Sequence, residues 1–219
     1  MKLSRPMITG VAAVILVVVL GAAVQSSCKA GGREPTLYEK IVDTLKNMKS
    51  FETEAYVMYK SNNKTTTYKT FQQAKSTGEY RIEVTAPDSA AGNITVFDGK
   101  VISQYNKKTE GRISVGTTES MERSEILLTS FIKNYLADKE VAVAAGKLAE
   151  TDETVLEAKI PGDNYYMATE KLWINNETML PVELIIYDQD NVARIIVNYK
   201  DFKYNVKLDS DIFTVEKNS

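Results

Sequence analysis

Apolar and polar positions divide the chain into a short apolar N-terminal segment and a longer amphipathic part. Lys2 and Arg5 precede an apolar run over residues 7–24, and no acidic residue occurs before Glu34. Basic residues, then an apolar stretch, then small and polar residues are typical of a signal peptide. The basic residues stay on the cytoplasmic side while the rest crosses the membrane. We therefore expect residues 1–27 to be a signal peptide that exports the rest of the chain.

The apolar run ends at the only cysteine of the sequence, Cys28. The residues before it are similar to a bacterial lipobox, in which small residues precede a cysteine that is lipidated. Ser26 and Ser27 fit that pattern, whereas Gln25 departs from it because an aliphatic residue is usual there. We expect a diacylglyceryl anchor on Cys28 and a flexible tether over residues 28–35. An uncleaved membrane anchor stays the alternative, because a run of this length nearly spans a bilayer.

Two stretches have the periodicity of amphipathic helices. The first covers residues 36–48, begins with the capping-box pair Thr36 and Glu39, and has charges of both signs on its polar side. Because that side has no basic excess, packing against a core explains this helix better than binding to a membrane surface. The second covers residues 120–136. Four apolar residues of the first helix share a side, and six residues form the stripe of the second: Leu37, Ile41, Leu45 and Met48; Ile126, Leu127, Phe131, Ile132, Tyr135 and Leu136.

Much of the remaining chain alternates with the period of β-strands. The clearest strand is 79–85, and Asp98-Gly99 is the strongest hairpin signal. Further strands are expected at 51–59, 65–73, 93–97, 101–105, 140–144, 154–160, 165–174, 182–187, 193–199 and 202–206. Because short turns join only antiparallel neighbours, we expect an α+β, mainly β domain over 36–219. In it, amphipathic helices pack on the concave face of a large curved antiparallel sheet, an incomplete barrel.

The composition excludes several classes of function, mainly through residue types that the sequence lacks. The 219 residues are 43% hydrophobic and include 27 basic and 29 acidic residues, a net charge of −2. This balance argues against a nucleic-acid-binding protein, which normally has a basic excess. Histidine is absent from the sequence, which removes the usual general base and the commonest zinc ligand. We therefore expect a binding protein without catalytic, metal-binding or cofactor-binding residues.

Acidic and aromatic residues are numerous, but their spacing does not indicate a catalytic set. Acids surround the second helix, where they suit the helix dipole better than a metal site. Two Asp-x-Asp pairs lack the glycine and distal glutamate of a calcium loop and are interpreted as turns. These residues are Glu110, Glu119, Glu122 and Glu125, and the pairs Asp188 with Asp190 and Asp209 with Asp211. Trp173 is expected to be buried or half-buried in a strand. The 12 tyrosines fit sheet packing and, as the alternative, a binding face.

Six short motifs, taken in order, resemble the family of LolA- and RseB-like proteins over residues 36–215. They are Gly-Glu-Tyr-Arg-Ile-Glu-Val at 78–84, Ala-Gly-Asn-Ile-Thr-Val-Phe-Asp-Gly-Lys at 91–100, Gln-Tyr-Asn at 104–106, Lys-Leu-Trp-Ile-Asn at 171–175, Leu-Pro-Val at 180–182 and Asp-Ile-Phe at 211–213. The resemblance implies an incomplete β-barrel closed by helices around an apolar cavity. Within the family, the sequence is most similar to the clostridial germination lipoproteins of the GerS type.

This resemblance implies a role in making the spore cortex. GerS-type proteins partner an N-acetylmuramoyl-L-alanine amidase of the CwlD type, which acts in forming muramic-δ-lactam. We therefore expect a non-catalytic lipoprotein on the outer side of the cell or forespore membrane that licenses such an amidase. The resemblance assigns no partner-contacting residue. A carrier or a sensor of lipid or lipoprotein acyl chains in the apolar cavity is the alternative function. A homodimer through an exposed sheet edge stays open.

Overall fold

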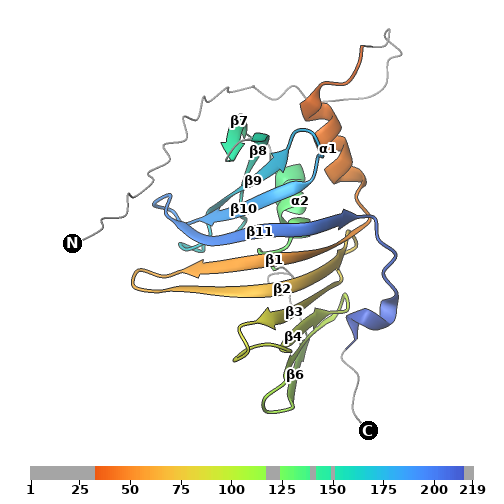
Figure 1. The fold of residues 1–219 in the computed structure, drawn as a ribbon, viewed down its shortest axis with the longest axis vertical. Coiled ribbons are helices and arrows are strands. Elements are labelled where there is room, and N and C mark those ends of the chain that lie inside the picture. Colours follow the sequence, from red (N-terminus) through yellow and green to blue (C-terminus); the bar gives the residue numbers. More distant parts are fainter. Residues whose placement is uncertain (1–32, 117–123, 139–141, 149–150, 215–219) are drawn as a thin grey trace, which may run out of the picture.

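The computed structural model describes residues 33–116, 124–138, 142–148 and 151–214. These residues form one eleven-stranded antiparallel sheet, two α-helices and a short 3₁₀ helix (Figure 1). The strands are β1 (Ser50–Lys60), β2 (Thr65–Lys75), β3 (Tyr80–Ala86), β4 (Ile94–Phe97), β5 (Val101–Asn106), β6 (Gly111–Gly116), β7 (Ala142–Leu148), β8 (Thr151–Lys159), β9 (Thr169–Asn175), β10 (Pro181–Tyr187) and β11 (Ala193–Tyr204). The helices are α1 (Leu37–Asn47), α2 (Leu128–Ala137) and the 3₁₀ helix η1 (Ser210–Phe213).

The strand order is β6-β5-β4-β3-β2-β1-β11-β10-β9-β8-β7. Two meanders, β1 to β6 and β7 to β11, therefore meet where β1 pairs with β11. The segment between the meanders contains α2, which Figure 1 shows behind the sheet. The sheet is open, with β6 and β7 at its two ends. The expected large antiparallel sheet with amphipathic helices on one face is confirmed.

Helix α1 begins with the predicted capping box. The backbone N–H of Glu39 donates to the Thr36 hydroxyl at 3.2 Å, and the Thr36 N–H donates to the Glu39 carboxylate at 2.7 Å. These two bonds satisfy donors that a helix start leaves without intrahelical partners. Of the predicted apolar side, Ile41, Leu45 and Met48 are buried, whereas Leu37 in the first turn is exposed. The helix therefore packs on the core along its last two turns.

The second helix starts later than predicted. Among the described residues, 124–127 form a turn and the helix begins at Leu128. The carbonyl oxygen of Ser124 accepts the N–H of Leu127 and the hydroxyl of Ser130, both at 2.9 Å. Because this turn holds Leu127 in an extended conformation, its side chain enters the core ahead of the helix proper. Residues 120–123 of the predicted helix lie outside the described residues.

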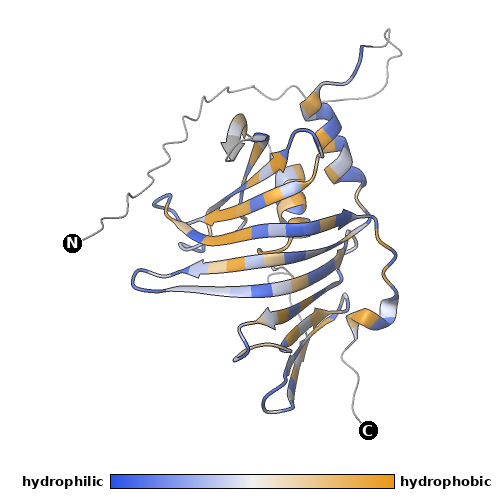
Figure 2. Ribbon diagram, in the orientation of Figure 1, coloured by the Kyte–Doolittle hydropathy of each residue, from blue (hydrophilic) through white to orange (hydrophobic). Residues whose placement is uncertain are grey.

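The hydrophobic core lies between the two helices and the sheet. Its fully buried members come from α2 and from six strands of both meanders: Phe51, Ala55, Val57, Ala74, Leu128, Phe131, Leu156, Leu172, Ile174, Leu184 and Val197. Full burial of one leucine or phenylalanine side chain contributes about 1.5–3 kcal/mol. Since the sheet alternates, these residues share its concave face. Figure 2 shows the alternation as apolar and polar bands along β9, β10 and β11.

One polar contact attaches α2 to the sheet within this core. The Asn134 side-chain amide donates to the Glu170 carboxylate of β9 at 2.5 Å, and both residues are buried. The hydroxyl of Tyr199 on β11 is buried near them. Its burial, and then the charge of Glu170, raise the pKa of Tyr199 above its ordinary value. A hydrogen bond to a buried carboxylate fixes the position of the helix over β9.

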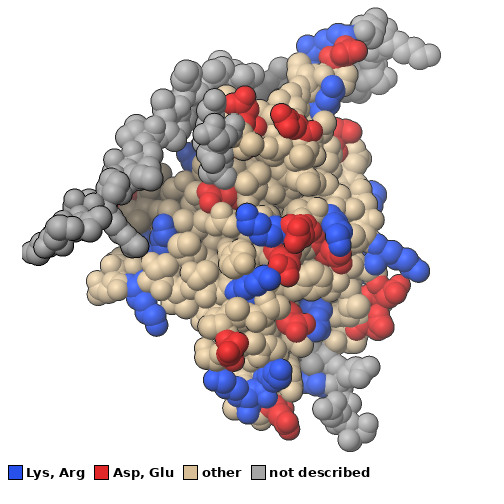
Figure 3. Space-filling view, in the orientation of Figure 1, with Lys and Arg blue, Asp and Glu red and all other residues tan. Residues whose placement is uncertain are grey.

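The opposite face of the sheet is solvated and charged. Figure 3 shows lysine and arginine interspersed with aspartate and glutamate on that face. Three ion pairs link neighbouring strands there: Glu54 with Lys69 at 2.7 Å, Glu52 with Lys203 at 2.9 Å and Glu157 with Lys171 at 3.0 Å. Exposed pairs of this kind contribute about 0–1 kcal/mol each. They keep the outer face soluble more than they hold the fold.

The structure corrects the expected strands at three places and confirms the weak one. Strand β6 was not predicted, because 111–116 contains only two large apolar residues. Strand β9 begins at Thr169, so Tyr165 is not in a strand. The predicted strands 193–199 and 202–206 are one strand, β11, in which the pairing shifts beside Asp201. The weak strand predicted at 140–144 is β7, which the structure describes from Ala142 onward.

The membrane-targeting prediction falls outside what the structure describes. Residues 1–32, and with them Cys28, are not among the described residues. Within 33–116, 124–138, 142–148 and 151–214, no helix has the length and apolarity that a membrane crossing requires.

Candidate functional site

Those acidic residues considered from the sequence that the structure describes do not form one site. Glu110 lies in the turn before β6 and Glu125 in the turn before α2, while Glu119 and Glu122 lie outside the described residues. The described part of the chain contains no group of three or more histidine, cysteine, aspartate or glutamate side chains that could hold a metal ion. Trp173 is half-buried in β9, as expected.

One of the Asp-x-Asp pairs organises a turn, as predicted. The side chain of Asp188 is buried between β10 and β11, and its carboxylate accepts the backbone N–H groups of Asp190 at 2.9 Å and Val192 at 2.8 Å. Asn191, at φ 60°, takes the left-handed conformation that asparagine tolerates in turns. The same carboxylate forms an ion pair with Arg194 at 2.6 Å.

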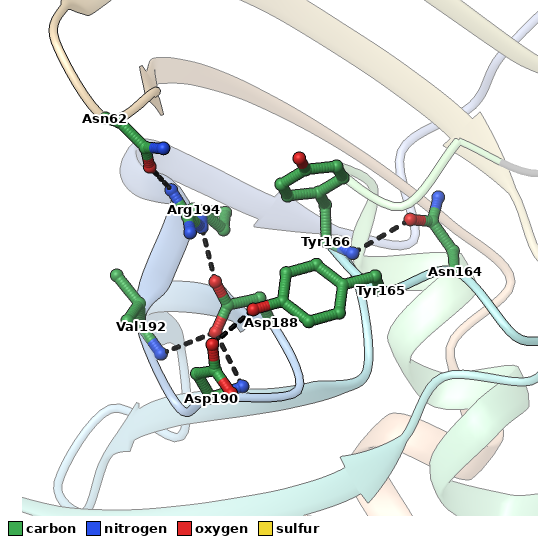
Figure 4. Close-up of polar contacts among 8 residues, drawn as sticks. All are labelled: Asn62, Asn164, Tyr165, Tyr166, Asp188, Asp190, Val192 and Arg194. Carbon is green, nitrogen blue, oxygen red and sulfur yellow. Dashed lines mark hydrogen bonds and ion pairs between the residues drawn. The ribbon is translucent and has the colours of Figure 1, made fainter.

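This turn is connected to two other loops at the same end of the sheet. The Arg194 guanidinium donates to the Asn62 side-chain oxygen in the β1–β2 turn at 2.8 Å. The N–H of Gln189 donates to the carbonyl of Tyr165, in the β8–β9 loop, at 2.9 Å. Figure 4 shows Arg194 between Asn62 and Asp188, with Tyr165 directed toward Asp190. Three loops that are far apart in sequence therefore form one connected surface.

Two consecutive tyrosines are exposed on this surface. The hydroxyl of Tyr165 donates to the Asp190 carboxylate, and the N–H of Tyr166 donates to the Asn164 side chain at 2.9 Å. The two rings meet edge to face, with centroids 5.1 Å apart. The guanidinium of Arg194 lies 5.5 Å from the centre of the Tyr166 ring, within range of a cation–π contact. We call Tyr165, Tyr166, Val192 and Arg194, with Asp190 at the rim, the tyrosine surface.

On the tyrosine surface, the charges of Asp188 and Arg194 neutralise each other. Burial alone would raise the pKa of Asp188, but the Val192 N–H and the Arg194 guanidinium outweigh it and hold this pKa below its ordinary value. The carboxylate therefore stays ionised and keeps Arg194 neutralised. The hydrogen bond to Asp190 raises the pKa of Tyr165, so its hydroxyl stays protonated. The arrangement contains no activated nucleophile and suits binding.

A second candidate site is a groove on the concave face of the sheet. It encloses about 470 Å³ between strands β1 to β5 and the turn before α2. Apolar side chains make up much of its lining, among them Val57, Tyr68, Ile82, Val84, Ile102 and Ile126. Thr70, Thr95 and Gln104 add polar groups. A groove of this size and lining can accept an apolar chain. We call it the concave groove.

The resemblance in the sequence implied an apolar cavity, whereas no sequence pattern was interpreted as the tyrosine surface. The alternation of Tyr80, Ile82 and Val84 indicates which face of β3 is apolar. The tyrosine surface depends on contacts between Asn62 and Arg194, which lie 132 positions apart. A local signal did exist, because Pro161-Gly162 marks a loop directly before the two tyrosines.

Residues 8–213 match the family described as Sporulation protein YdcC-like. The chain belongs to the YdcC-like family of sporulation proteins. No curated protein matches the sequence of this YdcC-like chain. The family match covers the described sheet and both helices, so it applies to the whole fold and not to one part of it.

Solved structures are similar to this YdcC-like protein. An uncharacterized conserved protein from Thermus thermophilus aligns with a TM-score of 0.53 and 14% identity, over 84% of this chain and 96% of that one. A chain of the CwlD amidase–GerS lipoprotein complex from Clostridioides difficile is 28% identical, with a TM-score of 0.49, over 82% and 100%. A LolA superfamily protein from Nitrosomonas europaea is 15% identical, with a TM-score of 0.44, over 82% and 96%. The sporulation role implied by the resemblance in the sequence agrees with the family match over residues 8–213.

Proposed function

We propose that this YdcC-like protein is an exported, membrane-anchored binding protein that licenses a cell-wall amidase of the CwlD type during formation of the spore cortex. The observation that carries the proposal is the match of residues 8–213 to a family of sporulation proteins. The absence of histidine from the sequence supports a division of labour. On this proposal the partner supplies the hydrolytic chemistry, and this chain supplies a rigid binding surface.

The amidase is the first partner to test. GerS-type proteins, which the sequence resembles, act with such an enzyme, and the CwlD–GerS complex names the pair. The fold supports a binding role because its open sheet displays loops at fixed positions. Functional residues are often carried on loops that a rigid scaffold positions.

The proposal places the protein at a membrane. Residues 1–27 direct export, Cys28 carries the lipid, residues 28–35 form the tether and 36–219 form the LolA-like domain. A Cys28→Ala variant of the full chain should then lose its membrane association while keeping its fold. Fractionation of cells producing wild type and variant, with labelling by radioactive fatty acid, tests this. Equal membrane association and no label in wild type would favour the uncleaved anchor.

Affinity capture tests the proposed partner. The tagged full chain is extracted with mild detergent from sporulating cells, and the retained proteins are identified by mass spectrometry. The expected result is a stoichiometric amidase of the CwlD type. The same capture from vegetative cells is the control, since a cortex function requires enrichment in sporulating cells. Capture without an amidase would contradict the proposal.

The concave groove supports one alternative function. Its apolar lining, which includes Ile82, Val84 and Ile126, suits an acyl chain. A carrier or sensor of acyl chains would retain lipid through purification. Mass spectrometry of organic extracts from the captured chain detects such lipid. Lipid at one equivalent together with no amidase would favour this alternative.

A further inference from the structure

The tyrosine surface exposes apolar side chains that a protein in water normally covers or replaces. Tyr166 is 59% exposed, Val192 48% and Tyr165 40%. They come from two different loops that hydrogen-bond to each other through Gln189 and Tyr165. Scattered exposed apolar residues are ordinary, but a cluster rimmed by polar groups marks a contact site.

The cluster is held in place before any partner binds. Asp188 fixes the β10–β11 turn through two backbone N–H groups and fixes Arg194 through an ion pair. Arg194 in turn lies against the ring of Tyr166, while Asp190 holds the hydroxyl of Tyr165. Side chains that are already ordered lose less conformational entropy on binding. The rings are therefore presented in a fixed position at small entropic cost.

The residue types are those that dominate binding energy between proteins. Tyrosine and arginine are enriched at the centres of protein interfaces, where single residues contribute most of the affinity. The Asp188 carboxylate neutralises Arg194, so burying this pair together leaves no lone charge. Asp190 at the rim is exposed, and so is Asp163, two residues before Tyr165 in the chain.

A protein fits this surface better than a glycan does. A sugar ring stacks flat on an open aromatic face, whereas Arg194 and Tyr165 already contact the Tyr166 ring. The exposed methyl groups of Val192 make no favourable contact with a hydrated sugar, whereas they fit an apolar hollow on a protein. We propose that the tyrosine surface is where the amidase partner docks, with Tyr166 entering an apolar hollow and a hydrogen-bond donor or cation of the partner facing Asp190. This inference rests on the proposed function.

Binding of purified full-length variants to the purified amidase tests the inference. Tyr166→Ala should weaken the complex by about 30-fold or more, as truncation of a central interface residue does. Val192→Asp should also weaken it by about 10-fold or more, because it places a charge in the apolar contact. The matched control is Tyr56→Thr, which removes a tyrosine that is 42% exposed on the solvated face of β1. It should bind within about 3-fold of wild type.

Different outcomes test the docking surface and the proposed amidase partnership separately. Thermal unfolding and circular dichroism first establish that each variant is folded. If wild type does not bind the amidase, the proposed function fails and the inference falls with it. If wild type binds and folded Tyr166→Ala and Val192→Asp bind equally well, the function stands and the docking surface is wrong. If the variants lose binding to purified cortex glycan and keep the amidase, the surface is a glycan site and the inference is overturned.

Discussion

The two halves of the sheet share the alternation of apolar and polar residues, but their apolar faces differ in how far the helices cover them. In the half formed by β8 to β11 and β1, the concave side chains lie under the helices, and Leu156, Leu172 and Leu184 are fully buried. In the arm formed by β3 to β6, helices cover less of the same face. There Ile113 and Val115 of β6 are exposed, Ile113 by 66%. Alternation therefore defines an apolar face, and the helices decide whether it becomes core or groove.

This difference separates the two candidate sites. The tyrosine surface lies at the turns of the covered half, where Asp188, Arg194 and the strands β10 and β11 hold it fixed. The concave groove extends from β1 and β2 into the open arm, where β3, β4 and β5 line it. A protein that docks rigid partners is expected to use the first, and an acyl carrier the second.

The largest expected effect is the loss of stability when a core side chain is removed from the covered half. Leu172→Ala removes a fully buried side chain from β9 and should lower the free energy of unfolding by about 2–5 kcal/mol. Ile113→Ala on β6 removes an exposed one and should change it by no more than about 0.5 kcal/mol. Urea unfolding followed by tryptophan fluorescence measures both. Equal losses would show that the arm contributes to the core as much as the covered half does.

The polar contact between α2 and the sheet should have a smaller effect. Asn134→Ala removes the amide that donates to Glu170 and should cost about 1–3 kcal/mol, because a buried carboxylate loses a donor. Lys133→Ala, on the exposed side of the same helix, is the matched control. Chemical unfolding of both variants compares them. If Asn134→Ala proved as stable as its control, the contact would not hold α2 in place.

The smallest effect concerns acid stability of the tyrosine surface. Asp188 has a folded pKa below its ordinary value of 3.8. The stability that this group contributes is fully present above about pH 4 and is lost as the pH falls through the folded pKa. Asp188→Asn should therefore start less stable at pH 7 and lose less stability than wild type between pH 5 and pH 2. Asp209→Asn, which removes an exposed carboxylate, is the matched control. Parallel acid curves for wild type and Asp188→Asn would contradict the pKa shift.

Local patterns in the sequence predicted much of the fold. The capping box of Thr36 and Glu39, the alternation of β3 and the hairpin at Gly99 each depend on neighbouring residues, and each is confirmed. Strand β6 was not predicted because its pairing with β5 defines it, while its own sequence contains only two large apolar residues. The start of α2 was misplaced because Ser124 bonds to Leu127 and Ser130 and forms a turn that periodicity does not register.

The tyrosine surface was less predictable for a related reason. A period-two pattern placed Tyr165 in a strand, but its hydroxyl and carbonyl bond to the β10–β11 turn. Asn62 and Arg194 come from opposite meanders and meet only because β1 pairs with β11. Contacts between turns follow from the strand order, and no short window of sequence contains that order.

The most direct test of the account is site-specific crosslinking in sporulating cells. The full-length chain carries a photoactivatable amino acid at position 166 in one strain and at position 56 in another. We expect a cell-wall amidase to be crosslinked from position 166 and not from position 56. Crosslinking of the amidase from position 56 alone, or lipid and no amidase from either position, would contradict it.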